Sequence, residues 1–312
     1  MSQASIRTRA LSRRFGRTLA LDQVDLEVPE GAIFALVGAN GAGKTTLIKL
    51  LMNILRPTAG AAQVLGIVSQ SLTGEAFTGI GYVSENQELP EGMKVGELLD
   101  YMRGFYPSWD RELERDLVRQ FDLPLDRKLK NLSRGMKMKA AFASSLAYRP
   151  RLIVLDEPFS GLDPLVRDEL IEVLLDRAQE TTIFLSSHDL AEIESFSSHI
   201  GYLDHGRLLF SEEMTSLSAR FRQVTVTLAA PAALPAGLPK TWLEAESSDC
   251  VARFVESHFS EPETEQNIRE HFAGARAVNF DPMSLREIFL AIARTRREQE
   301  HQRKQAGEET KG

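Results

Sequence analysis

The chain has 312 residues, of which 43% are hydrophobic, so it is long enough for two domains and at least one large core. Its net charge of −7 argues against a globally basic nucleic-acid-binding protein, and no apolar run approaches the roughly 18 residues of a membrane-spanning helix. Cys250 is the only cysteine, so no disulfide can form within the chain, which fits a reducing compartment. The first residues, MSQASIRTRALSRR, lack the apolar segment of a signal peptide. We therefore expect a protein that does not itself cross a membrane.

Apolar strands and helices alternate from the start of the chain. Residues 24–28, VDLEV, alternate strictly between apolar and polar, which predicts a half-exposed strand. Residues 32–37 are wholly apolar, as is typical of a buried parallel strand. A glycine-rich loop follows, and then a predicted helix over 44–55, which RPTAG ends. The more polar segment from about 89 to 148 is predicted to be rich in helices.

The same alternation continues beyond this polar segment. RLIVLDEP at 151–158 predicts a second buried strand, and a helix is expected near 165–179. TTIFLSSH at 181–188 predicts a third strand, followed by a helix, and GYLDHGRLLF at 201–210 predicts two short strands around a His-Gly turn. Buried strands that alternate with helices indicate a parallel α/β core, with a helical insertion at about 87–148.

The character of the sequence changes after about residue 218. We expect a large α/β domain over 1–218, a small α+β domain over 219–295 and a charged, disordered tail over 296–312. Within the small domain, strands are predicted at 223–228 and 250–259, and a helix at 263–272.

A last helix is predicted at the end of the small domain. Ser284 and Glu287 have the spacing of a capping box. An amphipathic stripe follows, formed by Leu285, Ile288, Phe289 and Ile292.

GANGAGKTT at 38–46 fits the phosphate-loop pattern G-x-x-x-x-G-K-[ST]. Its glycines let backbone amides close around an anion at a helix N-terminus. Lys44 would reach the β- and γ-phosphates of a nucleotide, and the Thr45 hydroxyl would ligate Mg²⁺. A turn could match the pattern by chance, but the position between a buried strand and a helix favours phosphate binding. We expect nucleotide contacts from Gly38, Ala39, Asn40, Gly41, Ala42, Gly43, Lys44, Thr45 and Thr46.

Two polar groups follow buried strands. In LIVLDEP, Asp156 would hold Mg²⁺ through water and Glu157 would polarise the water that attacks the γ-phosphate. Alone, such an acidic pair is more often a helix cap or a solvated turn, but after a phosphate loop a functional role is favoured. His188 lies where its strand ends, at the edge where ligands of parallel sheets bind, and could donate a hydrogen bond to the γ-phosphate. A lone histidine there is usually structural.

NLSRGMKMKAAFASS at 131–145 predicts a helix with Ser133 as its N-cap. Gly135 lies in the first turn, where glycine costs up to about 1 kcal/mol relative to alanine. We therefore expect something to approach the backbone at this glycine, although no acid, base or metal ligand is adjacent in the sequence.

Taken in order, these motifs resemble the ATP-binding cassette family, the ATPase subunits of ABC transporters. The resemblance covers residues 1 to about 215 and rests on GANGAGKT, LSRGM in place of Leu-Ser-Gly-Gly-Gln, LIVLDEP, SGLD at 160–163 and SSH. It implies a P-loop NTPase core with a parallel sheet, an antiparallel β subdomain and a helical insertion. It also implies ATP and Mg²⁺ as cofactors, ATP hydrolysis, and Phe15 as an aromatic that stacks on adenine. The alternative for Phe15 is a core phenylalanine.

In this family two ATPase subunits face each other head to tail. The resemblance therefore implies that Ser133 and Gly135 bind the γ-phosphate of ATP held by a second copy or a paralogous subunit. A helix N-terminus with free amides suits an anion. The other implied partner is a separately encoded membrane permease, through which this cytoplasmic protein would lie on the inner face of the cell membrane. No nucleic acid is expected as a partner.

Two departures from the family pattern affect the implied roles. Arg134 and Met136 replace a glycine and the glutamine of the usual signature, and the resulting form is similar to the Ser-Lys-Gly-Met-Lys of antibiotic, peptide and lipid exporters. In GYVSENQ, Glu85 aligns with the glutamine that usually touches Mg²⁺ and senses the membrane subunit. Glu85 could substitute as an oxygen ligand, and Gln87 is the other candidate.

A transporter ATPase is the favoured function, and the resemblance to those exporters implies export. The rival is a soluble ABC protein of translation or DNA repair, but this chain has one cassette and no long coiled coil before its signature. Another phosphate-loop ATPase or kinase would leave LSRGM and SSH unexplained. Residues 85–106 are expected to dock the permease, because aromatic residues cluster there or just beyond, although such residues often belong to the core. These aromatics are Tyr101, Phe105, Tyr106 and Trp109.

Overall fold

The structure, a computed structural model, describes residues 4–295. The tail predicted over 296–312 lies outside the described residues. Contacts divide the chain into two compact units, Met1–Glu212 and Glu213–Gly312. Each unit has a hydrophobic core of its own. Among the described residues, no helix combines the length and the apolar character needed to cross a membrane.

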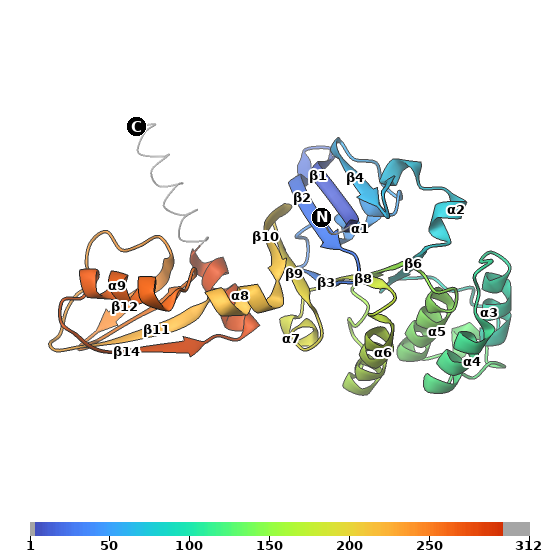
Figure 1. Ribbon diagram of the computed structural model, residues 1–312. Coiled ribbons are helices and arrows are strands. Elements are labelled where there is room, and N and C mark those ends of the chain that lie inside the picture. The colour runs from blue at the N-terminus through green and yellow to red at the C-terminus, as the bar shows by residue number, and fades with distance from the viewer. Residues whose placement is uncertain (1–3, 296–312) are drawn as a thin grey trace. The chain divides into compact units, whose positions relative to one another are not determined.

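A six-stranded sheet in the order β10-β9-β3-β8-β7-β6 forms the centre of the first unit (Figure 1). Its strands are β3 (Ile33–Val37), β6 (Ile80–Ser84), β7 (Leu152–Asp156), β8 (Thr182–Ser187), β9 (His199–Asp204) and β10 (Arg207–Glu213). From β9 to β6 neighbouring strands pair in parallel. Every residue of β3, β7 and β8 is buried, which confirms the three buried strands expected from the sequence. The carboxyl ends of these strands therefore share one edge of the sheet.

A second, antiparallel sheet has the strand order β2-β1-β4-β5. Its strands are β1 (Ala4–Phe15), β2 (Thr18–Pro29), β4 (Ala59–Val64) and β5 (Ile67–Val68). The strand predicted at 24–28 is the second half of the longer β2. Several register shifts interrupt the pairing of β1 with β2, and such bulges break the alternation by which a strand is found in a sequence.

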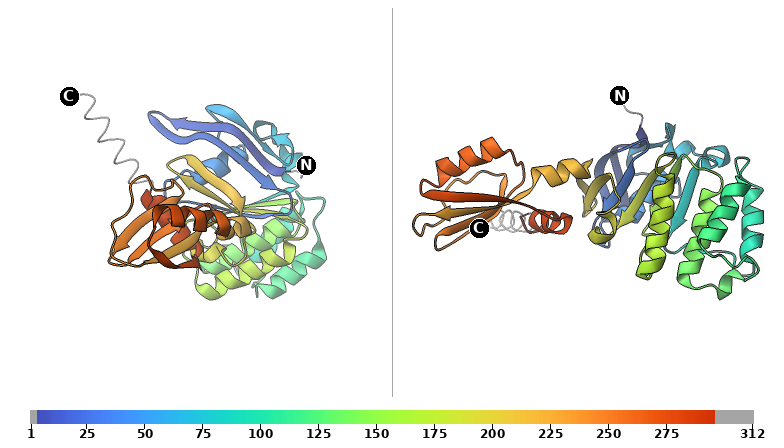
Figure 2. Two further views of the ribbon diagram at one scale, coloured as in Figure 1. Left: turned by 60° about the vertical axis from the view of Figure 1, so that its left-hand side comes forward. Right: turned by 60° about the horizontal axis from the view of Figure 1, so that its bottom comes forward.

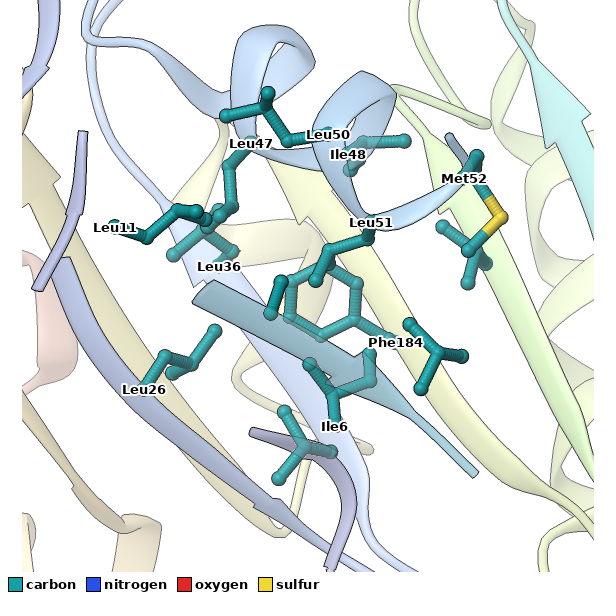
Figure 3. Close-up of a cluster of buried hydrophobic side chains, with 14 of the residues drawn as sticks. Ile6, Leu11, Leu26, Leu36, Leu47, Ile48, Leu50, Leu51, Met52 and Phe184 are labelled. Atoms are coloured by element: carbon teal, nitrogen blue, oxygen red, sulfur yellow. The ribbon is translucent and has the colours of Figure 1, made fainter. Parts of the chain in front are cut away.

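Helix α1 (Lys44–Leu51) packs between the two sheets in a shared core. Figure 3 shows Leu47 and Leu51 of this helix beside Leu36 of β3 and Phe184 of β8, all fully buried. Burying each such side chain contributes roughly 1.5–3 kcal/mol to the stability of the fold. This packing therefore holds α1 in place against the sheets.

The predicted helix over 44–55 is too long at its C-terminal end. Asn53 has a positive φ of 56°, and the amides of Ile54 and Leu55 both donate to the Lys49 carbonyl. Asparagine tolerates this left-handed conformation, which ends helices in the manner of a C-cap. The end of α1 at Leu51 is therefore set by local backbone hydrogen bonds.

Helices cover the opposite face of the six-stranded sheet, as Figure 1 and the left view of Figure 2 show. They are α3 (Val95–Arg103), α4 (Arg111–Gln120), α5 (Arg134–Leu146) and α6 (Pro164–Arg177). The first three confirm the helix-rich segment predicted from about 89 to 148, and α6 confirms the helix predicted near 165–179. Two single-turn helices, α2 (Gly74–Phe77) and α7 (Leu190–Ile193), complete the unit.

The second unit is an antiparallel sheet in the order β12-β13-β11-β14 with helices. Its elements are α8 (Met214–Arg220), β11 (Arg222–Leu228), β12 (Trp242–Ser248), β13 (Val251–Glu256), α9 (Glu261–His271), β14 (Ala275–Pro282) and a helix over 285–295. The predicted capping box is confirmed, because the Ser284 amide donates to Glu287 (2.7 Å) and the Glu287 amide donates to the Ser284 hydroxyl (3.3 Å). The strands β12 and β14 are not apparent from the sequence.

Candidate functional site

Close backbone approaches explain the glycines of the loop between β3 and α1. A Cβ atom at Gly38 would lie 2.2 Å from the Leu203 carbonyl oxygen of β9. Gly43 has a φ of 112°, and a Cβ there would lie 2.7 Å from the Ala20 carbonyl oxygen. Gly41 has a φ of 83° and needs glycine for its conformation. The loop is thus held against β2 and β9, while Ala39, Asn40 and Gly41 are exposed and Ala42 is buried.

Lys44 is the first residue of α1, and only 5% of it is exposed. Its ammonium group donates to the Gly38 carbonyl at 2.6 Å and forms an ion pair with the Glu157 carboxylate at 3.0 Å. Thr45 and Thr46 follow it in the first turn of the helix. A buried cation inside a loop of backbone amides at a helix N-terminus is an arrangement that attracts phosphate groups.

Asp156 lies at the carboxyl end of β7 and accepts two hydroxyl hydrogen bonds. Its Oδ1 atom accepts from Thr45 Oγ1 at 3.0 Å and from Ser186 Oγ at 2.8 Å. The parallel register pairs Asp156 directly with Ser186, which explains this contact between β7 and β8. Residues far apart in the sequence, on α1 and two strands, therefore meet at one carboxylate.

These oxygen atoms fit a magnesium ion. Burial raises the pKa of the Asp156 carboxyl above its usual range, while the hydrogen bonds from Ser186 and Thr45 act in the opposite direction. A carboxylate that is desolvated beside neutral hydroxyl donors gains from a cation at the same place. Hydroxyl and carboxylate oxygens are the hard ligands that Mg²⁺ prefers.

Glu157 is held at both of its carboxylate oxygens. Oε1 pairs with Lys44, and Oε2 lies 2.7 Å from Nδ1 of His188. An ionised carboxylate can only accept, so Nδ1 of His188 donates in this contact and Nε2 is the nitrogen left to face a substrate. The Glu157 backbone has a φ of 52°, a conformation that is unfavourable without glycine and that clusters at functional sites. Its amide donates to the Ser186 hydroxyl at 3.0 Å, which fixes this backbone.

Phe15 lies at the end of β1, where it pairs with Thr18 across the turn to β2. The side chain is 42% exposed, so the core interpretation is wrong. The Arg13 guanidinium lies 4.4 Å from the centre of the Phe15 ring. Thr18, the pairing partner of Phe15, lies two residues before Ala20, whose carbonyl oxygen approaches the phosphate loop at Gly43.

The start of α5 has the cap expected from the sequence. Ser133 is exposed, and its hydroxyl accepts from the Met136 amide at 3.2 Å. Gly135, however, is buried, and a Cβ there would lie 3.2 Å from both γ-carbons of Val166 in α6. The group that approaches this glycine in the structure is therefore a side chain of the same chain.

The carboxylate of Glu85 lies among groups that the sequence does not place near it. Oε1 of Glu85 accepts from Nη2 of Arg134 at 2.7 Å and from Oγ of Ser160 at 2.9 Å. Gln87 lies close by, with its side-chain oxygen 3.4 Å from the Ser84 amide. A metal-ligand role of Glu85 would compete with these contacts.

Ser186 and Ser160 are the site residues that sequence reasoning missed. The signal for Ser186 was present, because polar residues at the end of the otherwise apolar strand β8 mark the ligand edge of a parallel sheet. Ser160 begins the SGLD motif at 160–163, but the sequence assigned it no contact, because it lies in a loop and not at the end of a strand.

An apolar groove of about 420 Å³ lies between the helical insertion and the sheet. Its lining includes Ile54, Phe77, Tyr82, Glu88, Leu98, Tyr101 and Met102. Of the four aromatics noted in the sequence, Tyr101 and Phe105 are exposed, whereas Tyr106 stacks on Tyr148 at 3.8 Å and Trp109 donates to Glu114 at 2.6 Å. Two of the four therefore stabilise the insertion itself.

Comparisons with known proteins agree with this geometry. Residues 21–160 match the family model described as ABC transporter. The bacitracin transport ATP-binding protein BcrA of Enterococcus faecalis is 31% identical over 70% of this chain and 73% of that protein. The daunorubicin/doxorubicin resistance ATP-binding protein DrrA of Streptomyces peucetius is 34% identical over 66% of this chain and 64% of that protein. A solved structure of an ATP-binding subunit of an ABC transporter is 29% identical, with a TM-score of 0.64, over 69% of this chain and 92% of that one.

Proposed function

The chain belongs to the family of ABC transporter ATP-binding proteins, which are ATPases, and we propose that it hydrolyses ATP between two head-to-tail subunits to drive a separate membrane permease. The observation that carries this proposal is that Lys44 and His188 both contact the Glu157 carboxylate. The hydrogen-bonded pair of Thr45 and Asp156 lies next to it in the chain. Fold and family do not by themselves give this arrangement of charge.

Each group has a role that its position supports. The loop amides and Lys44 bind the phosphates, and the exposed ring of Phe15 stacks on adenine. Glu157 accepts a proton from the attacking water, while Nε2 of His188 faces the γ-phosphate. Thr45, and Asp156 through water, would hold Mg²⁺, which would supply positive charge to stabilise the phosphates.

The second half of each ATP site comes from the partner subunit. Ser133 is exposed at the N-terminus of α5, where a hydroxyl and backbone amides suit an anion. The ATP that its own chain binds lies at Lys44, on a different segment of the unit. We assign Ser133, together with the amide of Gly135, to the γ-phosphate held by a second copy or a paralogous subunit.

The apolar groove is the proposed docking site of the permease. It is bordered by the exposed ring of Tyr101, and Leu98 and Met102 of the same helix α3 line it. Its apolar lining and open shape fit a short amphipathic helix of a cytoplasmic permease loop. Docking there places the ATPase on the inner face of the cell membrane.

Export is the direction that we propose for the transporter. The relatives named for bacitracin transport and for daunorubicin/doxorubicin resistance support it, as does the Ser-Arg-Gly-Met-Lys form of the signature. No comparison points to translation or DNA repair, so the soluble alternative has no support.

Crosslinking tests the coupling to a permease. In a Cys250→Ser background, a single cysteine at Glu88, which lines the groove, should crosslink to the co-expressed permease. A cysteine at Glu270, exposed on the second unit, serves as the matched control. Labelling from Glu270 but not from Glu88 would refute the groove as the docking site.

A further inference from the structure

The Glu85 carboxylate joins three segments of the first unit. Glu85 follows β6, Arg134 is the first residue of α5, and Ser160 lies in the loop after β7. Oε1 of Glu85 accepts from both Arg134 (2.7 Å) and Ser160 (2.9 Å), and the Glu85 amide donates to the Asp156 carbonyl at 2.9 Å. One side chain thus contacts the signature and the loop that follows the acidic pair.

The Arg134 side chain also lies against that loop directly. A Cβ atom at Gly161 would lie 2.8 Å from Nη1 of Arg134, and the φ of Gly161 is 65°. Glycine at this position leaves room for the guanidinium group. On the other side, the Ser160 amide donates to the Glu157 carbonyl at 3.3 Å. The chain of contacts therefore runs from Arg134 through Glu85 and Ser160 to the backbone of Glu157.

The ion pair borders a small cavity. A cavity of about 70 Å³ is lined by Glu85, Arg134 and Lys137 among others. Gln87 and Leu89 line both this cavity and the apolar groove. The pair is therefore adjacent to the surface that we assign to the permease.

Glu85 and Arg134, which both depart from the family pattern, are chemically complementary. A carboxylate at position 85 offers only acceptors to the guanidinium group of Arg134, whereas a glutamine would also present an amide donor. The side chains are 30% exposed for Glu85 and 50% for Arg134. Ion pairs this exposed contribute little to the free energy of unfolding. We therefore look for the role of the pair in how it positions the start of α5 relative to the loop after β7.

We propose that Glu85 and Arg134 are a positioning pair that couples the two ATP sites of the dimer. The inference rests on the proposed function, in which Ser133 acts on the ATP of the partner subunit while Glu157 acts on the ATP of its own. Arg134 adjoins Ser133 in the chain, and the Ser160 amide donates a hydrogen bond to the Glu157 carbonyl. The pair therefore links the start of the signature, which belongs to one site, to the catalytic loop of the other.

A double-mutant cycle tests the pair. Glu85→Ala and Arg134→Ala are each expected to lower kcat about tenfold and to bring the Hill coefficient for ATP down toward one, with little change in KM or in the unfolding temperature. The double variant should be no worse than either single variant, because both remove the same link. Arg134→Lys keeps the charge and should retain most of the cooperativity.

A second ion pair provides the control. Arg7 and Glu27 join β1 to β2 at 3.0 Å with similar exposure, far along the chain from the site. Glu27→Ala should leave the rate and the Hill coefficient unchanged. If Glu27→Ala has the same effect as Glu85→Ala, loss of a surface ion pair explains the result and the proposal is overturned.

Magnesium dependence separates this role from metal binding. If Glu85 were a ligand of Mg²⁺, Glu85→Ala would raise the Mg²⁺ concentration needed for half-maximal activity, and Arg134→Ala would not. That outcome, multiplicative effects in the double variant, or a wild-type Hill coefficient of one would each overturn the proposal. Absence of ATP hydrolysis by the wild type would instead refute the proposed function.

Discussion

Glu157 illustrates how much a single residue depends on its surroundings. Lys44 and His188 hold its two carboxylate oxygens, so the side chain that we propose as the general base is held in one place. We expect Glu157→Gln to hydrolyse ATP on the order of 10²–10⁴ times more slowly, because general-base assistance is lost. ATP binding should persist and the closed dimer should accumulate, which steady-state assays and size-exclusion chromatography with ATP can measure. Hydrolysis at the wild-type rate would show that the assignment is wrong.

Lys44→Ala is the contrasting variant. It removes the cation that we assign to the phosphates and leaves the Glu157 carboxylate without its ion pair to Lys44. ATP binding itself should be lost in a titration with a fluorescent nucleotide. Lys49→Ala, in the last turn of the same helix, should bind ATP normally and controls for a general loss of positive charge.

The burial of the Asp156 carboxylate leads to a prediction about the stability of the fold. Its raised pKa means that the ionised form costs the folded state free energy, chiefly through desolvation. The cost is absent below the ordinary pKa of an aspartate in the unfolded chain, grows as the pH rises from there to the raised pKa, and is complete above it. Asp156→Asn removes the charge but keeps an oxygen that can accept from Thr45 and Ser186. We therefore expect the variant, without nucleotide, to unfold at a higher temperature than the wild type at neutral pH.

The same comparison at two further conditions checks the cause. At a pH low enough to protonate Asp156 in the wild type, the unfolding temperatures of wild type and variant should converge. With ATP and Mg²⁺ added, only the wild type should gain the full stabilisation. A variant less stable than the wild type at neutral pH would contradict a desolvated carboxylate.

At the scale of elements, a strand can be predicted from the sequence only where its residues have a clear hydrophobic pattern. Residues of β3, and of β7 before Asp156, are apolar because both faces of these strands are covered, so their positions could be predicted. The bulged β1, the short β5 and the strand β14 with its mostly exposed residues lack a clean pattern, and they were not predicted. Their pairing with other strands, rather than their own residues, makes them strands.

Some contacts of the site could also be predicted from the sequence, and others could not. The contacts of Lys44, Thr45 and Asp156 could be anticipated, because the motifs place these residues at the carboxyl edge of adjacent parallel strands or in the loop beside it. The bond between Glu85 and Arg134 spans 49 positions and depends on how α5 packs against β6. No motif states that distance, so it could not be predicted from the sequence.

Packing of α5 on α6 gives an element-scale prediction. Gly135→Ala would place a Cβ 3.2 Å from Val166, so the start of α5 must shift by a few tenths of an ångström. We expect lower ATPase activity in this variant and recovery when Val166→Ala is added, because the added methyl group lies inside its own chain. Activity and unfolding temperature should be measured for both. If Val166→Ala restores the unfolding temperature but not the activity, the glycine is required by the phosphate of the partner subunit.

At the scale of the whole molecule, the question is whether Ser133 acts within its own subunit. Ser133→Arg should block the closed dimer and abolish hydrolysis while ATP affinity of the monomer barely changes, since Lys44 and Thr45 lie elsewhere. The substitution also removes the N-cap bond to Met136, which costs about 0.5–2 kcal/mol. Ser133→Ala removes the same cap without added bulk and separates the two effects.

Mixing two inactive proteins decides the matter. In a heterodimer of Ser133→Arg and Lys44→Ala subunits, both lesions fall on the same composite site, because the signature of one subunit faces the phosphate loop of the other. The second site then has an intact loop and an intact signature. Random pairing would leave about a quarter of the sites intact, so partial recovery of ATPase activity is expected if one site can turn over alone. If Ser133→Arg instead weakens ATP binding by the monomer as much as Lys44→Ala does, Ser133 contacts the nucleotide of its own chain and the head-to-tail dimer is the wrong description.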